Sequence, residues 1–176
     1  MQYRRADICG GTYFFTVNLE ERNKTLLVDE FDKLRMVFND VKKRHPFKLD
    51  AMVVLPEHIH AMMTLPPNDN DFAKRWMLIK SDFSRLLPKT EKKNTSRQTK
   101  GERGIWQRRY WEHLIRDETD YINHVNYIHY NPVKHGYVTN AIDWKYSTIH
   151  RYVDCNLLPK NWAENIDDKI EYGEYV

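Results

Sequence analysis

Residues 53 to 63 read VVLPEHIHAMM, and this segment predicts two strands joined by a tight turn at Pro56 and Glu57. In a strand, residues two apart point to the same face, so His58 and His60 present two imidazoles side by side. Ile59 points to the opposite face, toward a core. Two imidazoles on a rigid strand form half of a divalent-metal site. The other half must come from another part of the chain.

The segments around this hairpin alternate between strand and helix patterns. Aromatic and β-branched residues predict a first strand, and apolar residues at helical spacing predict three helices. Asp71 is the expected N-cap of the second helix, and the third should end before Pro132, because the residue before a proline avoids helical geometry. The expected elements are strands at 11–19, 49–55, 58–65 and 111–116, helices at 29–43, 71–87 and 118–130, a mobile loop at 88–104 and a short structured segment at 143–152.

This order of elements predicts an α+β fold. With antiparallel pairing, β-α-β-β-α-β-α gives a ferredoxin-like sandwich, the plan that RNA-recognition modules also use. The third helix then follows the last core strand. We expect one domain over residues 1–152 and an acidic C-terminal tail over residues 153–176.

The composition is that of an ordinary globular protein, with 41% hydrophobic and 30% charged residues among 176. Cys9 and Cys155 form no CxxC pair, so we expect ordinary buried or half-buried thiols in a reducing intracellular setting. No signal-peptide pattern and no apolar run of membrane-spanning length is present. These features favour a cytoplasmic protein with no membrane partner.

Charge is distributed unevenly along the chain. Residues 80–109 hold ten Lys or Arg against three Asp or Glu, whereas residues 161–176 hold one Lys against five Asp or Glu. A basic segment that also contains Trp106, Tyr110 and Trp111 indicates contact with nucleic acid, through phosphates or by base stacking, although the aromatic residues could equally pack in the core. The acidic end could shield such a surface, or could simply be solvated.

The third predicted helix offers the missing parts of the site. Tyr127 and Asn131 are four residues apart and share one helix face. The Asn131 amide oxygen could complete a set of two histidines and one oxygen, with the Tyr127 phenol beside the ion. A phenol is a weak nucleophile at pH 7, so its phosphate electrophile needs polarising, and Mg²⁺ or Mn²⁺ is the natural ion for that task. The product would be a covalent phosphotyrosine.

Other residues near this helix leave alternatives open. Tyr130 is the second choice for the nucleophile, because it is rotated by roughly 100° from Asn131, and Tyr121 lies nearly two turns from Tyr127. His124 either packs or assists DNA contact and proton transfer. Glu57 either hydrogen-bonds a ligand histidine or is an ordinary turn carboxylate.

The motifs resemble those of the single-tyrosine HUH transposases of the IS200/IS605 type, and more closely those of the REP-associated tyrosine transposases. The matching segments are LPEHIH at 55–60 and YIHYNPVKHG at 127–136, with GGTYFFTV at 10–17, WQRRYWEH at 106–113 and DWKYST at 143–148. The resemblance implies that His58, His60 and Asn131 bind Mg²⁺ or Mn²⁺ and that Tyr127 is the nucleophile. It implies cleavage and rejoining of single-stranded DNA at REP-type (BIME-like) hairpins through a 5′-phosphotyrosine.

The resemblance also concerns partners. It implies that the N-terminal region helps recognise a short guide sequence at the foot of the hairpin. It favours a nucleoid-associated monomer, with a dimer as the alternative, and C-terminal segments that fold back near the active site. Together with the basic segment, the residues expected at DNA are Arg4, Arg5, Lys89, Lys92, Lys93, Arg97, Arg103, Arg108 and Arg109.

Two other function classes remain possible from the sequence. One is a hairpin-binding module that has lost catalysis, although such a module would not need the set His58, His60, Tyr127 and Asn131. The other is a metal-dependent phosphodiesterase that activates water, a class that usually carries more acidic ligands than this HxH motif offers.

Overall fold

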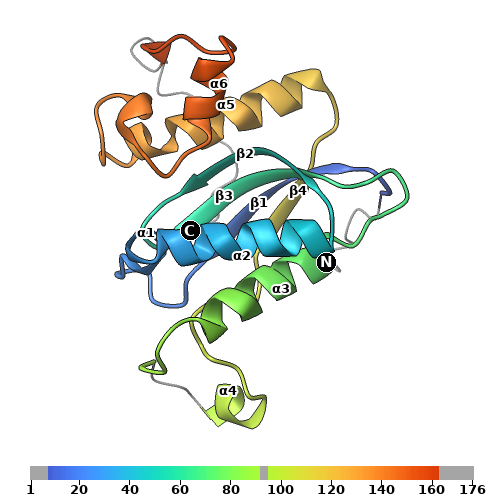
Figure 1. Cartoon of the computed structure of the whole chain (residues 1–176), viewed down its shortest axis with the longest axis vertical. Coiled ribbons are helices and arrows are strands. Elements are labelled where there is room, and N and C mark those ends of the chain that lie inside the picture. Colours follow the sequence, from blue (N-terminus) through green and yellow to red (C-terminus); the bar gives the residue numbers. More distant parts are fainter. Residues whose placement is uncertain (1–7, 92–94, 163–176) are drawn as a thin grey trace, which may run out of the picture.

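A four-stranded antiparallel sheet forms the centre of the computed structural model, which describes residues 8–91 and 95–162 (Figure 1). The strand order is β2-β3-β1-β4, which confirms the predicted ferredoxin-like plan. Each neighbouring pair is antiparallel. The strands are β1 (Thr12–Asn18), β2 (Lys48–Val54), β3 (His58–Thr64) and β4 (Trp111–Leu114).

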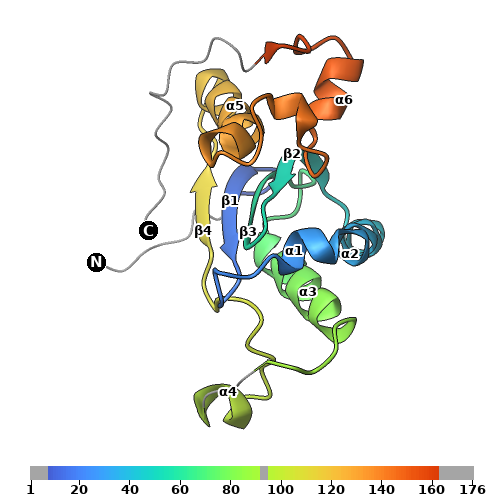
Figure 2. The same cartoon turned by 90° about the vertical axis from the view of Figure 1, so that its left-hand side faces the viewer.

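Helices cover both faces of this sheet. In Figures 1 and 2, α2 and α3 lie on one side, and α5 and α6 lie on the other. Asp71 caps α3 as expected, because its carboxylate accepts a hydrogen bond from the Lys74 backbone N–H at 2.9 Å. The helices are α1 (Leu26–Asp29), α2 (Phe31–Arg44), α3 (Phe72–Arg85), α4 (Thr95–Thr99), α5 (Glu118–Lys134) and α6 (Ile149–Asp154), with a 3₁₀ turn η1 (Ala141–Asp143).

The alternation of β1 creates two cores, one on each face of the sheet. Phe15 and Val17 pack against α2 and α3, where Trp76 is fully buried. Phe14 points the other way and packs against α5, beside the buried Ile128. Since both faces bury apolar residues, the sheet is the middle layer of the molecule and α5 is held firmly over one face.

The hairpin predicted from residues 53–63 is present. β2 and β3 pair in antiparallel register, with Val54 opposite Ile59, and the Leu55 N–H donates to the His58 carbonyl at 2.9 Å across the turn. The histidines therefore lie on the face that α5 covers, while Ile59 belongs to the core formed with α2 and α3.

Three local predictions were wrong. The third helix does not end before Pro132 but continues to Lys134, because apolar burial of Ile128 and Pro132 compensates for the hydrogen bond that proline cannot donate. The loop predicted at 88–104 contains the short helix α4. Cys9 and Cys155 are exposed rather than buried or half-buried.

Candidate active site

The two histidines of β3 converge as the strand geometry predicts. Their Nε2 atoms lie 3.1 Å apart, and both side chains are almost fully buried. Two adjacent ligands of an octahedral ion, each at about 2.1 Å, lie about 3.0 Å from each other. The spacing of His58 and His60 therefore suits a single divalent ion held by both rings.

Partners on the outer ring nitrogens orient these imidazoles. Glu57 accepts a hydrogen bond from His58 Nδ1 at 2.9 Å, which leaves the lone pair of His58 Nε2 available. Burial raises the pKa of the Glu57 carboxyl, but its hydrogen bond and charge interaction with His58 outweigh burial and lower this pKa below its usual value. Glu57 thus has the orienting position that was one of its two predicted roles.

Thr16 is a part of the site that the sequence did not single out. Its hydroxyl lies 2.9 Å from His60 Nδ1, because Thr16 and His60 are paired residues on neighbouring strands. A hydroxyl either donates or accepts, so Thr16 supports both tautomers of His60. In one tautomer His60 Nε2 donates to His58, and in the other its lone pair is free for an ion.

Tyr127 lies against this pair, which brings together residues that are far apart in sequence. Its ring centroid is 5.2 Å from that of His60 and 5.9 Å from that of Phe14, with edge-on geometry in both contacts. The Lys134 ammonium lies 5.2 Å from the centre of the Tyr127 ring. A cation in this position stabilises negative charge that develops on the phenol oxygen.

Asn131 is one helical turn beyond Tyr127 on the inner side of α5. Its side chain is fully buried, and neither amide atom has a hydrogen-bond partner. A buried amide without partners costs about 1–3 kcal/mol, so a native protein rarely retains one without a reason. An oxygen donor without a partner, on the helix that carries Tyr127, fits a ligand for a hard cation that the two histidines would also hold.

The other tyrosines near α5 are less suited to act as nucleophiles. Tyr121 donates to an Asp50 carboxylate oxygen at 3.2 Å, and burial together with the Asp50 charge raises its pKa. Burial and the charge of Glu57 also raise the pKa of Tyr137. Tyr130 is half-buried, and on α5 it is rotated by roughly 100° from Asn131, whereas Tyr127 is one turn before Asn131 on the same face.

A second group of possible ligands lies at the start of α5. His113, Asp120 and His124 bring their ligand atoms within 4.8 Å of one another, and such a group could hold a metal ion. Asp120 also accepts hydrogen bonds from the Arg116 backbone and side chain, both at 3.1 Å. Burial raises the pKa of Asp120, but hydrogen bonds from His113 and Arg116 outweigh it and lower this pKa to about 2.

The histidine rings in this second group are stacked. The planes of His113 and His124 lie only 18° apart, with centroids separated by 4.7 Å. An imidazole binds an ion in the plane of its ring, and two nearly parallel rings do not readily share one ion. The group therefore fits a hydrogen-bonded network better than it fits a metal site, which supports the packed alternative for His124.

The residues expected at DNA differ in their surroundings. Arg97 and Arg103 form ion pairs within the protein, Arg97 with Glu20 at 2.6 Å and Arg103 with Glu91. Arg108 is exposed but pairs with Glu102 at 2.8 Å, whereas Lys89 and Arg109 are exposed. Arg4, Arg5, Lys92 and Lys93 lie outside the described residues, as does the end of the acidic tail from residue 163 onward.

The three aromatic residues of the basic segment also have different surroundings. Trp106 is buried and its indole N–H donates to the Lys80 carbonyl at 3.2 Å. Tyr110 packs at the edge of the core formed with α2 and α3. Trp111 packs on the other face, with its ring 5.6 Å from that of Phe14, and is therefore the one of the three that adjoins the candidate active site.

Comparison with known proteins identifies the family. A family model described as "Transposase IS200 like" matches residues 10–131. A REP-associated tyrosine transposase of Escherichia coli is 46% identical over 175 residues, which cover 99% of this chain and 98% of the relative. The chain belongs to the REP-associated tyrosine transposases. A Haemophilus influenzae protein, described provisionally as one, is 47% identical over 170 residues, covering 96% of this chain and 97% of that protein.

A solved structure extends the match to three dimensions. It is a REP-associated tyrosine transposase bound to a REP hairpin, with 44% identity, a TM-score of 0.81 and 98% of each chain covered. Family membership makes the chain a transposase of the IS200-like class, as the motifs predict. In the part of the chain that the structure describes, no helix has the length and apolar character needed to cross a membrane.

Proposed function

We propose that this protein cuts and rejoins single-stranded DNA at REP-type hairpins, with Tyr127 as the nucleophile and with Mg²⁺ or Mn²⁺ held by His58, His60 and Asn131. The observation that carries the proposal is the packing of the Tyr127 ring against His60, within a site whose two Nε2 atoms lie 3.1 Å apart. A binding module has no use for this combination of buried groups.

The chemical step transfers the 5′ phosphate of the cleaved DNA from the 3′ oxygen to the Tyr127 oxygen. The Tyr127 oxygen loses its proton and forms a bond to phosphorus, while the bond from phosphorus to the 3′ oxygen breaks. The 3′ oxygen takes up a proton and leaves as a hydroxyl, and the 5′ phosphate stays on Tyr127. Attack by another 3′ hydroxyl reverses the step and rejoins DNA without an external source of energy.

Each side chain has a defined task in this scheme. Lys134 stabilises the charge that develops on the Tyr127 oxygen, and Glu57 and Thr16 hold the two imidazoles in position. A bound divalent ion supplies Lewis-acid polarisation of the phosphate and alignment of its oxygens. The ion is assigned to the His58–His60 pair rather than to the stacked rings of His113 and His124, because the former direct their Nε2 atoms toward one common point whereas the latter lie nearly parallel.

The hairpin is assigned to this chain from its close relative, which is bound to a REP hairpin over a matching length. Among the described residues, the exposed cations Lys89, Arg108 and Arg109 are proposed to contact phosphates. The sequence alone adds Arg4, Arg5, Lys92 and Lys93, which lie outside the described residues. We further propose that the protein acts as a monomer at DNA in the cytoplasm and nucleoid. The transposase domain would span residues 1–152, although α6 continues to Asp154.

The test is formation of a covalent adduct. Wild type, Tyr127→Phe and Tyr130→Phe are incubated with a single-stranded oligonucleotide that carries a REP-like hairpin, with Mn²⁺ or with EDTA, and are resolved on a denaturing protein gel. We expect a DNA-linked band with wild type and Tyr130→Phe in Mn²⁺ only. Tyr127→Phe should reduce adduct formation by at least 10³-fold, because no other group replaces the nucleophile.

Two outcomes contradict the proposal in different ways. An adduct that survives in Tyr127→Phe but is lost in Tyr130→Phe assigns the chemistry to Tyr130. Tight hairpin binding with no adduct from any variant, under several oligonucleotides and both ions, identifies the chain as a hairpin-binding module.

A further inference from the structure

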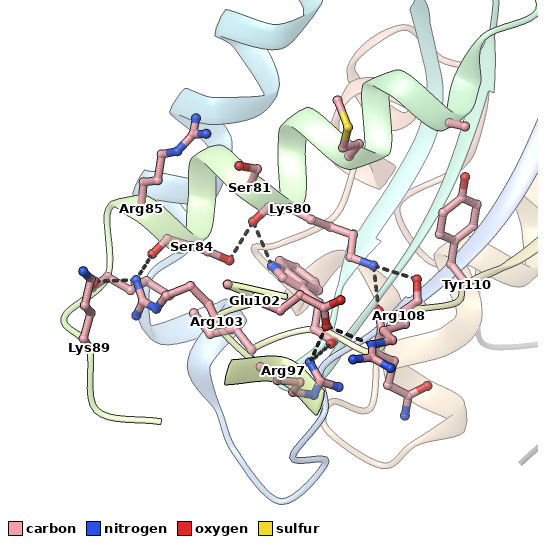
Figure 3. A pocket seen from close by; sticks show the side chains of 18 residues that line it. Lys80, Ser81, Ser84, Arg85, Lys89, Arg97, Glu102, Arg103, Arg108 and Tyr110 are labelled. Atoms are coloured by element: carbon pink, nitrogen blue, oxygen red, sulfur yellow. Dashed lines mark hydrogen bonds and ion pairs between the residues drawn. The ribbon is translucent and has the colours of Figure 1, made fainter. Parts of the chain in front are cut away.

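A hollow of about 800 Å³ lies between the outer side of α3 and the segment that returns from α4 to β4 (Figure 3). It is separate from the candidate active site, since His58, His60 and Tyr127 do not line it. α3 covers the face of the sheet opposite to α5. A ligand in this hollow would therefore not compete with the reacting phosphate.

Ion pairs and hydrogen bonds hold the wall of the hollow in place. Arg103 donates to the Pro88 carbonyl at 2.9 Å and pairs with Glu91, which ties the returning segment to the end of α3. Arg97 donates to the Trp106 carbonyl at 3.2 Å and pairs with Glu20. Because these contacts are internal to the protein, the hollow exists before any ligand enters.

The lining combines an apolar floor with a cationic rim. Met77, which is 58% exposed, and the half-buried Tyr110 both line the hollow. Lys80 lies 5.8 Å from the centre of the Tyr110 ring and donates to the Gln107 carbonyl at 2.6 Å. Glu102 is the only carboxylate among the lining residues, and it pairs with Arg108 at 2.8 Å.

We propose that this hollow binds one unpaired nucleotide of the hairpin DNA, with its base against Tyr110 and its phosphate at Lys80 and Arg108, which lie at the same end of the hollow (Figure 3). This inference rests on the proposed function for the class of partner. A ligand for the hollow must present a flat apolar surface and negative charge together, and a nucleotide does both. Paired bases are shielded within a stem, so the nucleotide must be unpaired.

The hollow and the active site are joined at the edge of the sheet. Tyr110 lines the hollow, and the next residue, Trp111, begins β4 on the catalytic face, where it contacts Phe14. β4 is an outer strand of the sheet, so no further strand blocks the way around it. A DNA strand that leaves the hollow can cross this edge and reach Tyr127.

The experiment uses the full chain with Tyr127→Phe, so that no DNA is cut. The base analogue 2-aminopurine replaces each unpaired nucleotide of the hairpin oligonucleotide in turn, and its fluorescence is followed as protein is added. We expect one position to change its emission far more than the others. An abasic nucleotide at that position should weaken binding about tenfold.

Ser81→Trp, which fills the hollow, should remove the response and weaken binding by a similar factor. Met36→Trp is the matched control, because Met36 is exposed on α2 away from the hollow. Circular dichroism and urea unfolding confirm that both variants fold.

Three results overturn the proposal. The response could be equal at all positions, it could persist in Ser81→Trp, or the abasic oligonucleotide could bind as tightly as the intact one. The covalent-adduct assay on wild type is read separately. An adduct without a position-specific response leaves the proposed function intact and removes the hollow as a nucleotide site. A position-specific response without an adduct supports the hollow as a nucleotide site and contradicts the proposed cleavage.

Discussion

Asn131 is the residue at which stability and the proposed chemistry are opposed. Its amide is completely buried and has no hydrogen-bond partner, which is unfavourable for folding in the absence of an ion. A metal ligand explains the retention of such a group, because the amide oxygen is satisfied only when the ion is bound. Neighbouring Tyr127 and His60 are instead held by ring packing.

Replacing the amide by an apolar group of similar size should separate these effects. We expect Asn131→Leu to raise the free energy of unfolding by roughly 1 kcal/mol in EDTA, since the unsatisfied amide is removed. Mn²⁺ should raise the unfolding midpoint of wild type but not of Asn131→Leu. Asn131→Asp keeps an oxygen ligand and should still respond to Mn²⁺. An equal response to Mn²⁺ in Asn131→Leu and wild type would show that the amide is not a ligand.

α5 is the element that carries both Tyr127 and Asn131, and its C-terminal end is built to hold them. The helix passes Pro132 and stops at Gly136, whose φ of +70° is a left-handed conformation. The Gly136 N–H donates to the Val133 carbonyl at 2.9 Å, and the Tyr137 N–H donates to the Pro132 carbonyl at 3.0 Å. This pair of bonds is the Schellman motif, and it requires a residue that tolerates positive φ.

Gly136→Ala should therefore destabilise the protein by about 1 kcal/mol through backbone strain, because an added Cβ meets no atom within 4 Å. Gly136→Asn should cost less, since asparagine tolerates this conformation better. Urea unfolding of the two variants beside wild type measures both values. If both variants are as stable as wild type, the left-handed conformation at position 136 does not require glycine.

At the scale of the whole molecule, the sheet separates the two surfaces to which the proposals assign DNA. The face under α5 carries the proposed chemistry, and the opposite side carries the hollow beside α3. His129 helps to close the first of these layers. It lies 3.0 Å from the Thr148 hydroxyl, and its ring centroid is 4.6 Å from that of Tyr152. α5 is in this way joined to the segment that follows it.

The buried position of His129 should make the protein less stable at acid pH. Burial, together with the charges of Arg151 and His150, lowers the pKa of His129 to about 3. The unfolded chain takes up this proton near pH 6.5, well before the folded protein does. The contribution of His129 to the free energy of unfolding should thus be fully present above about pH 6.5. It should decrease toward pH 3 by up to about 1.4 kcal/mol per pH unit.

His129→Leu should flatten the dependence of unfolding free energy on pH between 6.5 and 3, as measured by urea unfolding at several pH values. The slope should not vanish, because burial also lowers the pKa of His124. A variant with the same slope as wild type would mean that His129 takes up its proton equally in both states.

The sequence correctly predicted the features that depend on residues close together in the chain. The β2–β3 hairpin, the shared face of His58 and His60, and the Asp71 cap follow from periods of two residues, from turn residues and from capping preference. The spacing of Tyr127 and Asn131 likewise predicted that both lie on the inner side of one helix.

Features that depend on distant segments required the folded chain. Thr16 reaches His60 across 44 residues through the register of β1 on β3, and no local pattern encodes that register. The continuation of α5 through Pro132 depends on burial against the sheet, which overrides the local preference of proline. The wall of the hollow beside α3 is held by Arg97 and Arg103, which pair with glutamates inside the protein, whereas the sequence predicted a mobile basic loop that contacts nucleic acid. Sequence periodicity defines the faces of single elements, but packing energy between elements decides which faces meet.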